Sequence, residues 1–228
     1  MAGSGREKKE LHFYPGDKRL LFVVDAKLVL DVDAWGGPTY PGRKVPGEMQ
    51  AMPTTPGRFR VGWVGKYVTS SWKRSKIRWG ARLRRHPASS DDFLYEASPG
   101  QWRSVKAMTG ATRQQLEAEY ARLYKQPGVP ERWCFNDFGS VAIRYYEDRN
   151  DNHKRDAGEP LSGEMFHATA ESEADPGAVL YSSHGCIHLR PLDRDALLNG
   201  GAFALGTLVV VHNYGETTGV PRTPAANH

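Results

Sequence analysis

Cys186 is the residue whose neighbours most clearly suggest chemistry. Ser183, His184 and Gly185 precede it directly, and His167 lies farther upstream in the chain. A thiol attacks a carbonyl only as the thiolate, so a nucleophilic cysteine needs an imidazole that accepts its proton. A glycine before the nucleophile has no Cβ and lets the backbone approach a substrate closely. These residue types predict acyl transfer through a cysteine nucleophile.

The alternative interpretation is that Cys186 is a small buried residue, which is the commoner role of an isolated cysteine. The chain contains one other cysteine, Cys134, so the two could in principle form a disulfide. Because one of them lies in the candidate site, we expect two free thiols.

Composition is typical of a folded, turn-rich protein. The 228 residues are 39% hydrophobic and 11% aromatic, with 24 glycines and 15 prolines, enough for one domain with additions or two small ones. No apolar run approaches the roughly 20 residues that span a bilayer. The charged first ten residues are not followed by an apolar segment, so we expect no secretory signal peptide.

Basic residues are concentrated between positions 73 and 85, in a chain whose net charge is +5. Apolar and basic side chains alternate over residues 76–84, which predicts a half-buried strand. The basic face has two interpretations: a solvated surface, or an anion site that could bind nucleic acid with Trp72 and Trp79 as stacking platforms.

The remaining patterns predict mostly strands. Thr112 and Gln115 form a capping-box signature at the start of a helix over residues 112–125. A short helix is also expected over 192–199. The expected strands are 20–25 and 27–32 as a hairpin, a strand ending near Val64, 141–146, one opening at Met165–His167, and 206–212.

The Ser-His-Gly-Cys string with His167 upstream resembles the L,D-transpeptidase catalytic domain of the YkuD type. Thr54-Thr55-Pro56-Gly57 before a strand, and the ending Gly206-Thr207-Leu208-Val209, are also similar to that family. The resemblance implies a mainly β fold, a sandwich or barrel with a few short helices and an inserted helical segment.

The expected organisation has four parts. These are an N-terminal extension over 1–17, a catalytic domain over 18–213, an insertion within it over 86–131 that caps the cleft, and a disordered tail over 214–228.

The resemblance also implies a substrate, the tetrapeptide stem of peptidoglycan, and a mechanism. Cys186 would attack the carbonyl of the third stem residue with His167 as general base, and a carbapenem would acylate the same thiol. Backbone N–H groups at Gly185 and Cys186 would bind the oxyanion, while His184 and Ser183 would orient the loop. An amine or water would then resolve the thioester, and no metal or organic cofactor enters this chemistry.

The sequence departs from the family two residues after the cysteine. His188 stands where the family usually carries Arg or Asn. We expect His188 and Arg190 to contact the substrate, with Arg190 substituting in recognition of its carboxylate. The departure leaves the choice between transferase and hydrolase open.

Residues 148–159 have the side-chain spacing of a calcium loop. Oxygen-bearing side chains fall at loop positions 1, 3, 5, 9 and 12, and His153 occupies position 6, where such loops carry glycine. The predicted role is a structural Ca²⁺ site, and the alternative is a polar surface hairpin. The predicted ligands are Asp148, Asn150, Asn152, Asp156 and Glu159, with the Lys154 carbonyl at position 7.

Peptidoglycan lies outside the cytoplasm, so a chain without a leader needs another export route. We therefore expect an antibacterial effector that a type VI apparatus delivers to the periplasm and cell wall of a neighbour. Its partners would be stem peptides, a cognate immunity protein and a component of the secretion apparatus, with no nucleic acid and no membrane span. The alternatives are a housekeeping L,D-transpeptidase that forms cross-links, or a non-enzymatic module that binds cell wall or nucleic acid and tolerates loss of Cys186.

Overall fold

The computed structural model describes residues 7–222, and these form two compact units. Among the described residues, unit 1 comprises 7–63, 143–166 and 180–222, and unit 2 comprises 64–142 and 167–179. Unit 2 is therefore built from two stretches of chain that interrupt unit 1. The sequence-based boundaries of the insertion, 86–131, were too narrow.

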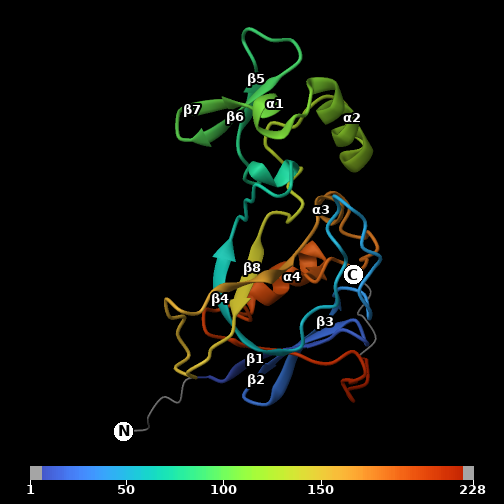
Figure 1. The fold of residues 1–228 in the computed structure, drawn as a ribbon, viewed down its shortest axis with the longest axis vertical. Helices are drawn as coiled ribbons and strands as arrows, with labels where there is room; N and C mark the ends of the chain where they lie inside the picture. The colour runs from blue at the N-terminus through green and yellow to red at the C-terminus, as the bar shows by residue number, and fades with distance from the viewer. Residues whose placement is uncertain (1–6, 223–228) are drawn as a thin grey trace. The chain divides into compact units, whose positions relative to one another are not determined.

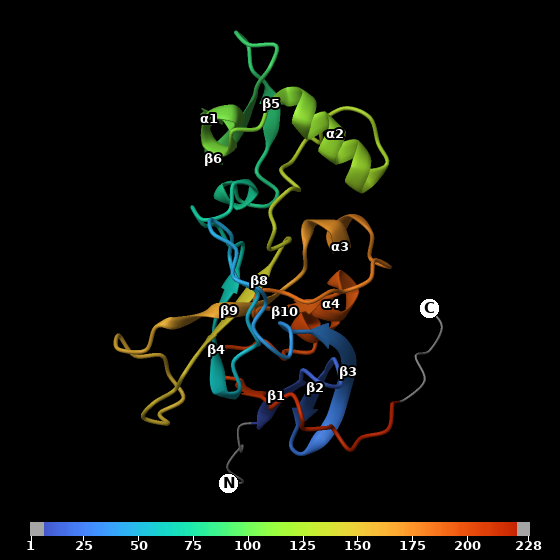
Figure 2. The same ribbon diagram turned by 45° about the vertical axis from the view of Figure 1, so that its right-hand side comes forward.

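Unit 1 is a closed β-barrel (Figures 1 and 2). Around the barrel the strand order is β1-β11-β4-β8-β9-β10-β3-β2, which confirms the predicted mainly β fold. The strands are β1 (Lys9–Tyr14), β2 (Arg19–Val24), β3 (Lys27–Trp35), β4 (Gly57–Gly65), β8 (Ala142–Tyr146), β9 (Leu161–His167), β10 (Ile187–Leu189) and β11 (Leu208–Val211).

Strands β2 and β3 form the predicted hairpin. Asp25 and Ala26 connect them with φ of 47° and 62°, the left-handed conformation of a two-residue turn that matches strand twist. Leu20 and Phe22 are fully buried in the barrel core. The alternation of apolar residues therefore predicted this hairpin correctly.

The N-terminal boundary was predicted wrongly. Residues 9–14 are not part of an extension but form β1, which pairs antiparallel with β2 and parallel with β11. Leu11 and Phe13 are fully buried, and the polar residues between them concealed this short alternating strand in a charged segment. Residues 1–6 lie outside the described residues.

The segment after β11 is ordered through residue 222 rather than a disordered tail. The Tyr214 hydroxyl donates to the Gly37 carbonyl at 2.8 Å and accepts the Thr54 N–H at 3.0 Å. Farther along, the Thr218 N–H donates to Asp17. These partners are far away in sequence, so nothing in the local composition predicted them. Positions 223–228 lie outside the described residues.

Strand β9 ends at His167, whereas the sequence predicted that a strand begins at Met165–His167. The predicted position of the strand was therefore wrong. The strand begins at Leu161, in a stretch where Gly163 and Glu164 obscure the β pattern. Helix α4 (Pro191–Asn199) follows β10 and confirms the predicted short helix. Its first position is proline, whose missing N–H costs nothing there.

Unit 2 contains a three-stranded sheet, β5 (Leu83–Arg85), β6 (Phe93–Ser98) and β7 (Gln101–Ser104). Its helices are η1 (Arg74–Lys76), α1 (Val105–Thr109), α2 (Arg113–Tyr124) and α3 (Ala170–Ala174). The predicted capping box is present in α2, with Thr112 and Gln115 each accepting the other's backbone N–H. Leu116 and Trp133 are fully buried in the core of this unit.

The continuous strand expected over 76–84 is absent: Arg82 forms an isolated bridge with Arg132, and strand β5 begins only at Leu83. Gly80 has a φ of +77° and breaks the stretch, while its N–H donates to the Trp133 carbonyl. Ile77 and Ala81 are buried, as the alternation of apolar and basic residues predicted. A turn, not a strand, places them in the core.

Candidate active site

The loop before β10 is held by the Ser183 side chain. The Ser183 hydroxyl accepts the Gly185 N–H at 3.0 Å and donates to the Cys186 carbonyl at 2.5 Å. The Ser183 N–H donates to the Gly36 carbonyl, next to β3. Ser183 is buried, so these bonds compete little with water. The loop that carries Cys186 is therefore fixed on the barrel.

Gly185 adopts a backbone conformation with φ of +117° that side chains rarely tolerate. A Cβ there would also lie 3.3 Å from Glu164 Oε1. Its N–H donates to the Ser183 hydroxyl, and the oxyanion role expected for this N–H stays a prediction. Gly185 contributes backbone shape in this conformation.

Cys186 is half-buried. Burial raises the pKa of its thiol to about 11, and the nearby Glu164 carboxylate acts in the same direction. A hydrogen bond from the Met165 backbone and the charge of Arg144 oppose this rise. A thiol with such a pKa is almost entirely protonated near neutrality, so nucleophilic attack requires a partner that removes its proton.

His167 is buried at the end of β9, the strand beside β10 in the barrel order. Its Nδ1 lies 2.8 Å from the Ala168 carbonyl oxygen. A carbonyl only accepts, so Nδ1 carries the proton and Nε2 is left as the basic nitrogen. The Phe138 ring packs against the imidazole at 4.9 Å between centroids. His167 is thus oriented as a proton acceptor through Nε2.

The other predicted site residues have different surroundings. His184 is exposed on the loop. His188 is buried in β10, with Nδ1 3.0 Å from the Tyr181 carbonyl. Arg190 Nη1 lies 2.8 Å from Asp33 Oδ2, so this guanidinium is already engaged by a carboxylate. The roles proposed for His188 and Arg190 in substrate binding stay predictions.

Glu164 was missed by the sequence analysis. Its carboxylate accepts hydrogen bonds from Thr55 and from the Tyr145 hydroxyl, beside the Gly185–Cys186 loop. Thr55 is 109 positions away, so no local motif marked the cluster. The only available signal was the family-like Thr-Pro-Gly segment, which placed Thr55 near the site.

Cys134 belongs to unit 2 and is a free thiol, as expected for both cysteines. Burial raises its pKa to about 11, although the hydrogen bond with Tyr124 opposes this. Its neighbours are Tyr124 and the apolar core, so it matches the ordinary role of a buried cysteine.

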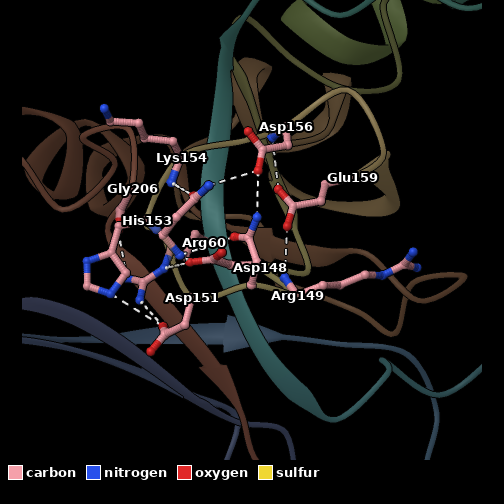
Figure 3. Close-up of polar contacts among 11 residues, drawn as sticks. Arg60, Asp148, Arg149, Asp151, His153, Lys154, Asp156, Glu159 and Gly206 are labelled. Atoms are coloured by element: carbon pink, nitrogen blue, oxygen red, sulfur yellow. Dashed lines mark hydrogen bonds and ion pairs between the residues drawn. The ribbon is translucent and has the colours of Figure 1, made fainter.

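The predicted calcium loop is organised around its own hydrogen bonds (Figure 3). Asp156 Oδ2 accepts from the side-chain amides of Asn150 and Asn152 at 2.7 and 2.8 Å. The two Glu159 oxygens accept the backbone N–H groups of Arg149 and Asp156. The structure therefore brings three of the predicted ligands together and uses Glu159 to close the loop.

The fifth predicted ligand, Asp148, faces Arg60 of β4 instead (Figure 3). Arg60 Nε lies 2.5 Å from Asp148 Oδ2, and Nη2 lies 3.1 Å from Asp151 Oδ1. The His153 N–H donates to Asp148, and His153 has a φ of 65° at the position where calcium loops carry glycine. A guanidinium thus supplies positive charge where the sequence predicted a metal ion.

Within residues 7–222, no helix combines the length and apolar character needed to cross a membrane.

Comparison with known proteins gave one match to a family model, described as the L,D-transpeptidase catalytic domain (YkuD), over residues 9–211. A search of curated proteins found no match. Similar solved structures include an L,D-transpeptidase from Xylanimonas cellulosilytica, with 12% identity, a TM-score of 0.39 and 92% of this chain covered. Another is Mycobacterium tuberculosis L,D-transpeptidase 1, with 14% identity, a TM-score of 0.38 and 90% coverage.

This chain covers 62% of the length of each of those two structures. The family model, in contrast, spans most of this chain and includes Cys186, His167 and the strands that carry them. The chain belongs to the L,D-transpeptidase catalytic domain family.

Proposed function

We propose that this protein is a cysteine-dependent acyl transferase or hydrolase of peptidoglycan stem peptides. The observation that carries the proposal is the fixed loop that presents Cys186 beside β9, at the Met165 backbone. Family membership supports L,D-transpeptidase-type activity, in which the substrate is the stem peptide of the cell wall. Ser183 holds the loop, and its loss would release the nucleophile from its position.

In the proposed reaction, His167 Nε2 accepts the Cys186 proton as the sulfur attacks the carbonyl of the third stem residue. The Nδ1 contact with the Ala168 carbonyl makes Nε2 the unprotonated nitrogen of this imidazole. Backbone N–H groups stabilise the oxyanion, and Cys186 N–H is the proposed donor because the Gly185 N–H is engaged. The C–N bond then breaks, D-alanine leaves with the proton from the imidazole, and a thioester remains.

The thioester has two fates. Attack by an amine of a neighbouring stem gives a cross-link, whereas attack by water gives the shortened stem. In both cases the sulfur leaves as thiolate and regains a proton. No step needs a metal or organic cofactor.

The test is mass spectrometry of a purified stem tetrapeptide after incubation with the protein. We expect loss of one D-alanine, together with cross-linked dimers where transpeptidation competes with hydrolysis. Cys186→Ala should abolish turnover, and His167→Ala should lower it by at least about 100-fold, the usual contribution of a general base. Cys134→Ala is the matched control and should retain wild-type turnover. Full activity of Cys186→Ala would overturn the proposal.

The biological setting inferred from the sequence stays a prediction. An antibacterial effector and a housekeeping transpeptidase would share this chemistry and differ in what the reaction does to the target wall. An immunity protein and a secretion-apparatus partner follow only from the effector interpretation.

A further inference from the structure

Glu164 is a carboxylate placed beside the nucleophile, where its charge does not help the first step of the reaction. It belongs to β9, and its side chain lies against Gly185, with Oε1 3.3 Å from the point that a Cβ would occupy. Burial is the largest cause of the raised pKa of the Cys186 thiol, and the negative charge of Glu164 raises that pKa further. The carboxylate therefore disfavours the thiolate. Because Glu164 opposes activation of the nucleophile, its role in the reaction must be a different one.

Its position is strongly constrained. The Thr55 N–H lies 3.1 Å from both carboxylate oxygens, and the Thr55 hydroxyl donates to Oε1 at 2.7 Å. The Tyr145 hydroxyl donates to Oε2 at 3.0 Å. Burial and the Glu164 charge raise the pKa of Tyr145 well above its ordinary value, so it stays a donor. Three donors from two other parts of the barrel therefore fix this carboxylate.

All three donors are neutral, so the negative charge of Glu164 is not compensated by them. Among residues 7–222, Glu164 forms no ion pair, although other partly buried carboxylates such as Asp148 and Asp31 do. Glu164 is half-buried and Thr55 is exposed, so solvent reaches the cluster. A fixed, accessible and unpaired carboxylate is suited to bind a cation.

We propose that Glu164 binds the ammonium group of the amine that resolves the Cys186 thioester. This inference rests on the proposed function, and it assigns Glu164 to the acceptor rather than to the thiol. The acceptor amine must reach the carbonyl carbon attached to Cys186. This brings the amine close to Gly185, the preceding residue, where the Glu164 side chain lies. Water carries no charge and gains nothing from this carboxylate. Glu164 therefore favours transfer over hydrolysis.

The bound ammonium first releases one proton to solvent, and the neutral nitrogen attacks the thioester carbon. The C–N bond forms, the C–S bond breaks, and its electron pair stays on sulfur. The second proton passes from nitrogen to the thiolate. The products are an amide, the free Cys186 thiol and one released proton.

The experiment measures the ratio of amine transfer to hydrolysis, because both reactions start from the same thioester. In wild type and Glu164→Gln, two acceptors are compared at pH 7: an alkyl amine, which is an ammonium ion, and hydroxylamine, which is uncharged. In Glu164→Gln, kcat/KM for the alkyl amine should fall about tenfold relative to hydrolysis, mainly through KM. The ratio for hydroxylamine should not change. Glu164→Asp should restore part of the preference for the alkyl amine.

Glu147→Gln is the matched control, since Glu147 is an exposed carboxylate paired with Arg149. It should leave both ratios at their wild-type values. If Glu164→Gln lowers the ratio equally for both acceptors, Glu164 only positions the loop and the proposal is wrong. An unchanged ratio for the alkyl amine would also overturn it.

A measurement on the wild-type enzyme covers the case in which Glu164→Gln does not fold. Added salt should raise the KM for the alkyl amine and leave that for hydroxylamine unchanged, because salt screens the attraction to a carboxylate. Equal salt effects on both acceptors would contradict a role for charge. Failure of the proposed function is distinguishable, since the wild type would then form no thioester at all.

Discussion

Cys186 and Cys134 are the two cysteines of this chain, and both are partly buried free thiols. Burial raises the pKa of each to about 11. In the proposed mechanism Cys186 has an imidazole partner, His167, whose Nδ1 contact with the Ala168 carbonyl makes Nε2 the unprotonated nitrogen. The difference between the two cysteines should therefore appear in their reactivity rather than in their burial.

We expect alkylation by iodoacetamide to show this difference. In wild type the rate at Cys186 should level off well below pH 11, because an imidazole that accepts the proton increases the reactive thiolate. In His167→Ala the rate should keep rising until about pH 11, the pKa that burial gives the thiol. Peptide mapping follows each cysteine, and Cys134 serves as the internal reference.

If the two pH profiles of Cys186 coincide, His167 is not its proton acceptor. A change in the profile of Cys134 as well would point to a general loss of structure.

At the scale of elements, Arg60 joins β4 to the loop after β8. Its guanidinium contacts Asp148, Asp151 and the Gly206 carbonyl, and the side chains of Arg60 and Asp148 are only 12% and 5% exposed. Burial alone would raise the pKa of Asp148, but the bonds from Arg60 and the His153 backbone outweigh it and lower the pKa. The ion pair therefore stabilises the folded state wherever Asp148 is ionised.

Arg60→Gln should lower the free energy of unfolding by roughly 3 kcal/mol at pH 7, because it leaves a buried carboxylate without its cation. A group with a lowered folded pKa contributes stability above its unfolded pKa and loses it as pH falls through the folded pKa. Wild type should therefore lose more stability than Arg60→Gln below about pH 4. Urea unfolding at both pH values measures this.

Arg60→Gln/Asp148→Asn should recover part of the loss at pH 7, since it removes the unpaired charge. No recovery in the double variant would mean that Arg60 stabilises the loop through packing alone.

The structural Ca²⁺ site in the same loop stays a prediction. It requires Asn150 and Asn152 to turn their amide oxygens toward the ion, whereas their amide nitrogens now contact Asp156. Asp148 Oδ1 is buried and has no hydrogen-bond partner among the described residues. Calcium should raise the melting temperature by binding the folded state, and Asp156→Ala should remove the gain. Equal melting temperatures in calcium and in chelator would contradict the site.

Elements with strong local signals were predictable from the sequence. The capping box of Thr112 and Gln115 marked α2, and alternation marked the β2–β3 hairpin. The failures have a common cause. Strand β1 depends on partners near residue 208, and the turn at Gly80 depends on Trp133. Contacts between distant residues decide such segments, and local patterns do not contain them.

In the candidate site, too, local sequence signals were predictable and contacts between distant residues were not. The sequence singles out Cys186, Gly185 and Ser183 because they are adjacent, and His167 because of the family-like spacing. Glu164 was missed because its partners Thr55 and Tyr145 meet it only in the folded barrel.

At the scale of the whole molecule, unit 2 interrupts the barrel twice. Its first stretch is residues 64–142, and its second, residues 167–179, begins at His167, the last residue of β9. The barrel carries the cysteine loop, and in the proposed function the substrate of that loop lies in the cell wall. The effect of the protein on a cell should therefore depend on the compartment it reaches.

Fused to a cleavable secretory leader, the protein should deform or kill a Gram-negative host, because stem peptides lie beyond the inner membrane. The same protein without the leader should be harmless, and Cys186→Ala should remove the effect. Growth curves and microscopy after induction measure this. Cytoplasmic toxicity that persists in Cys186→Ala would favour nucleic-acid binding through the basic residues 73–85. Exported protein that adds cross-links without harm would favour a housekeeping transpeptidase.

Formation of a covalent acyl-enzyme at Cys186 can be measured by intact-protein mass spectrometry after incubation with a carbapenem. We predict one adduct per molecule in wild type and in Cys134→Ala, mapped to Cys186 by peptide digestion, and none in Cys186→Ala. An adduct on Cys134, or an unmodified wild type under conditions in which the protein is folded, would contradict the account.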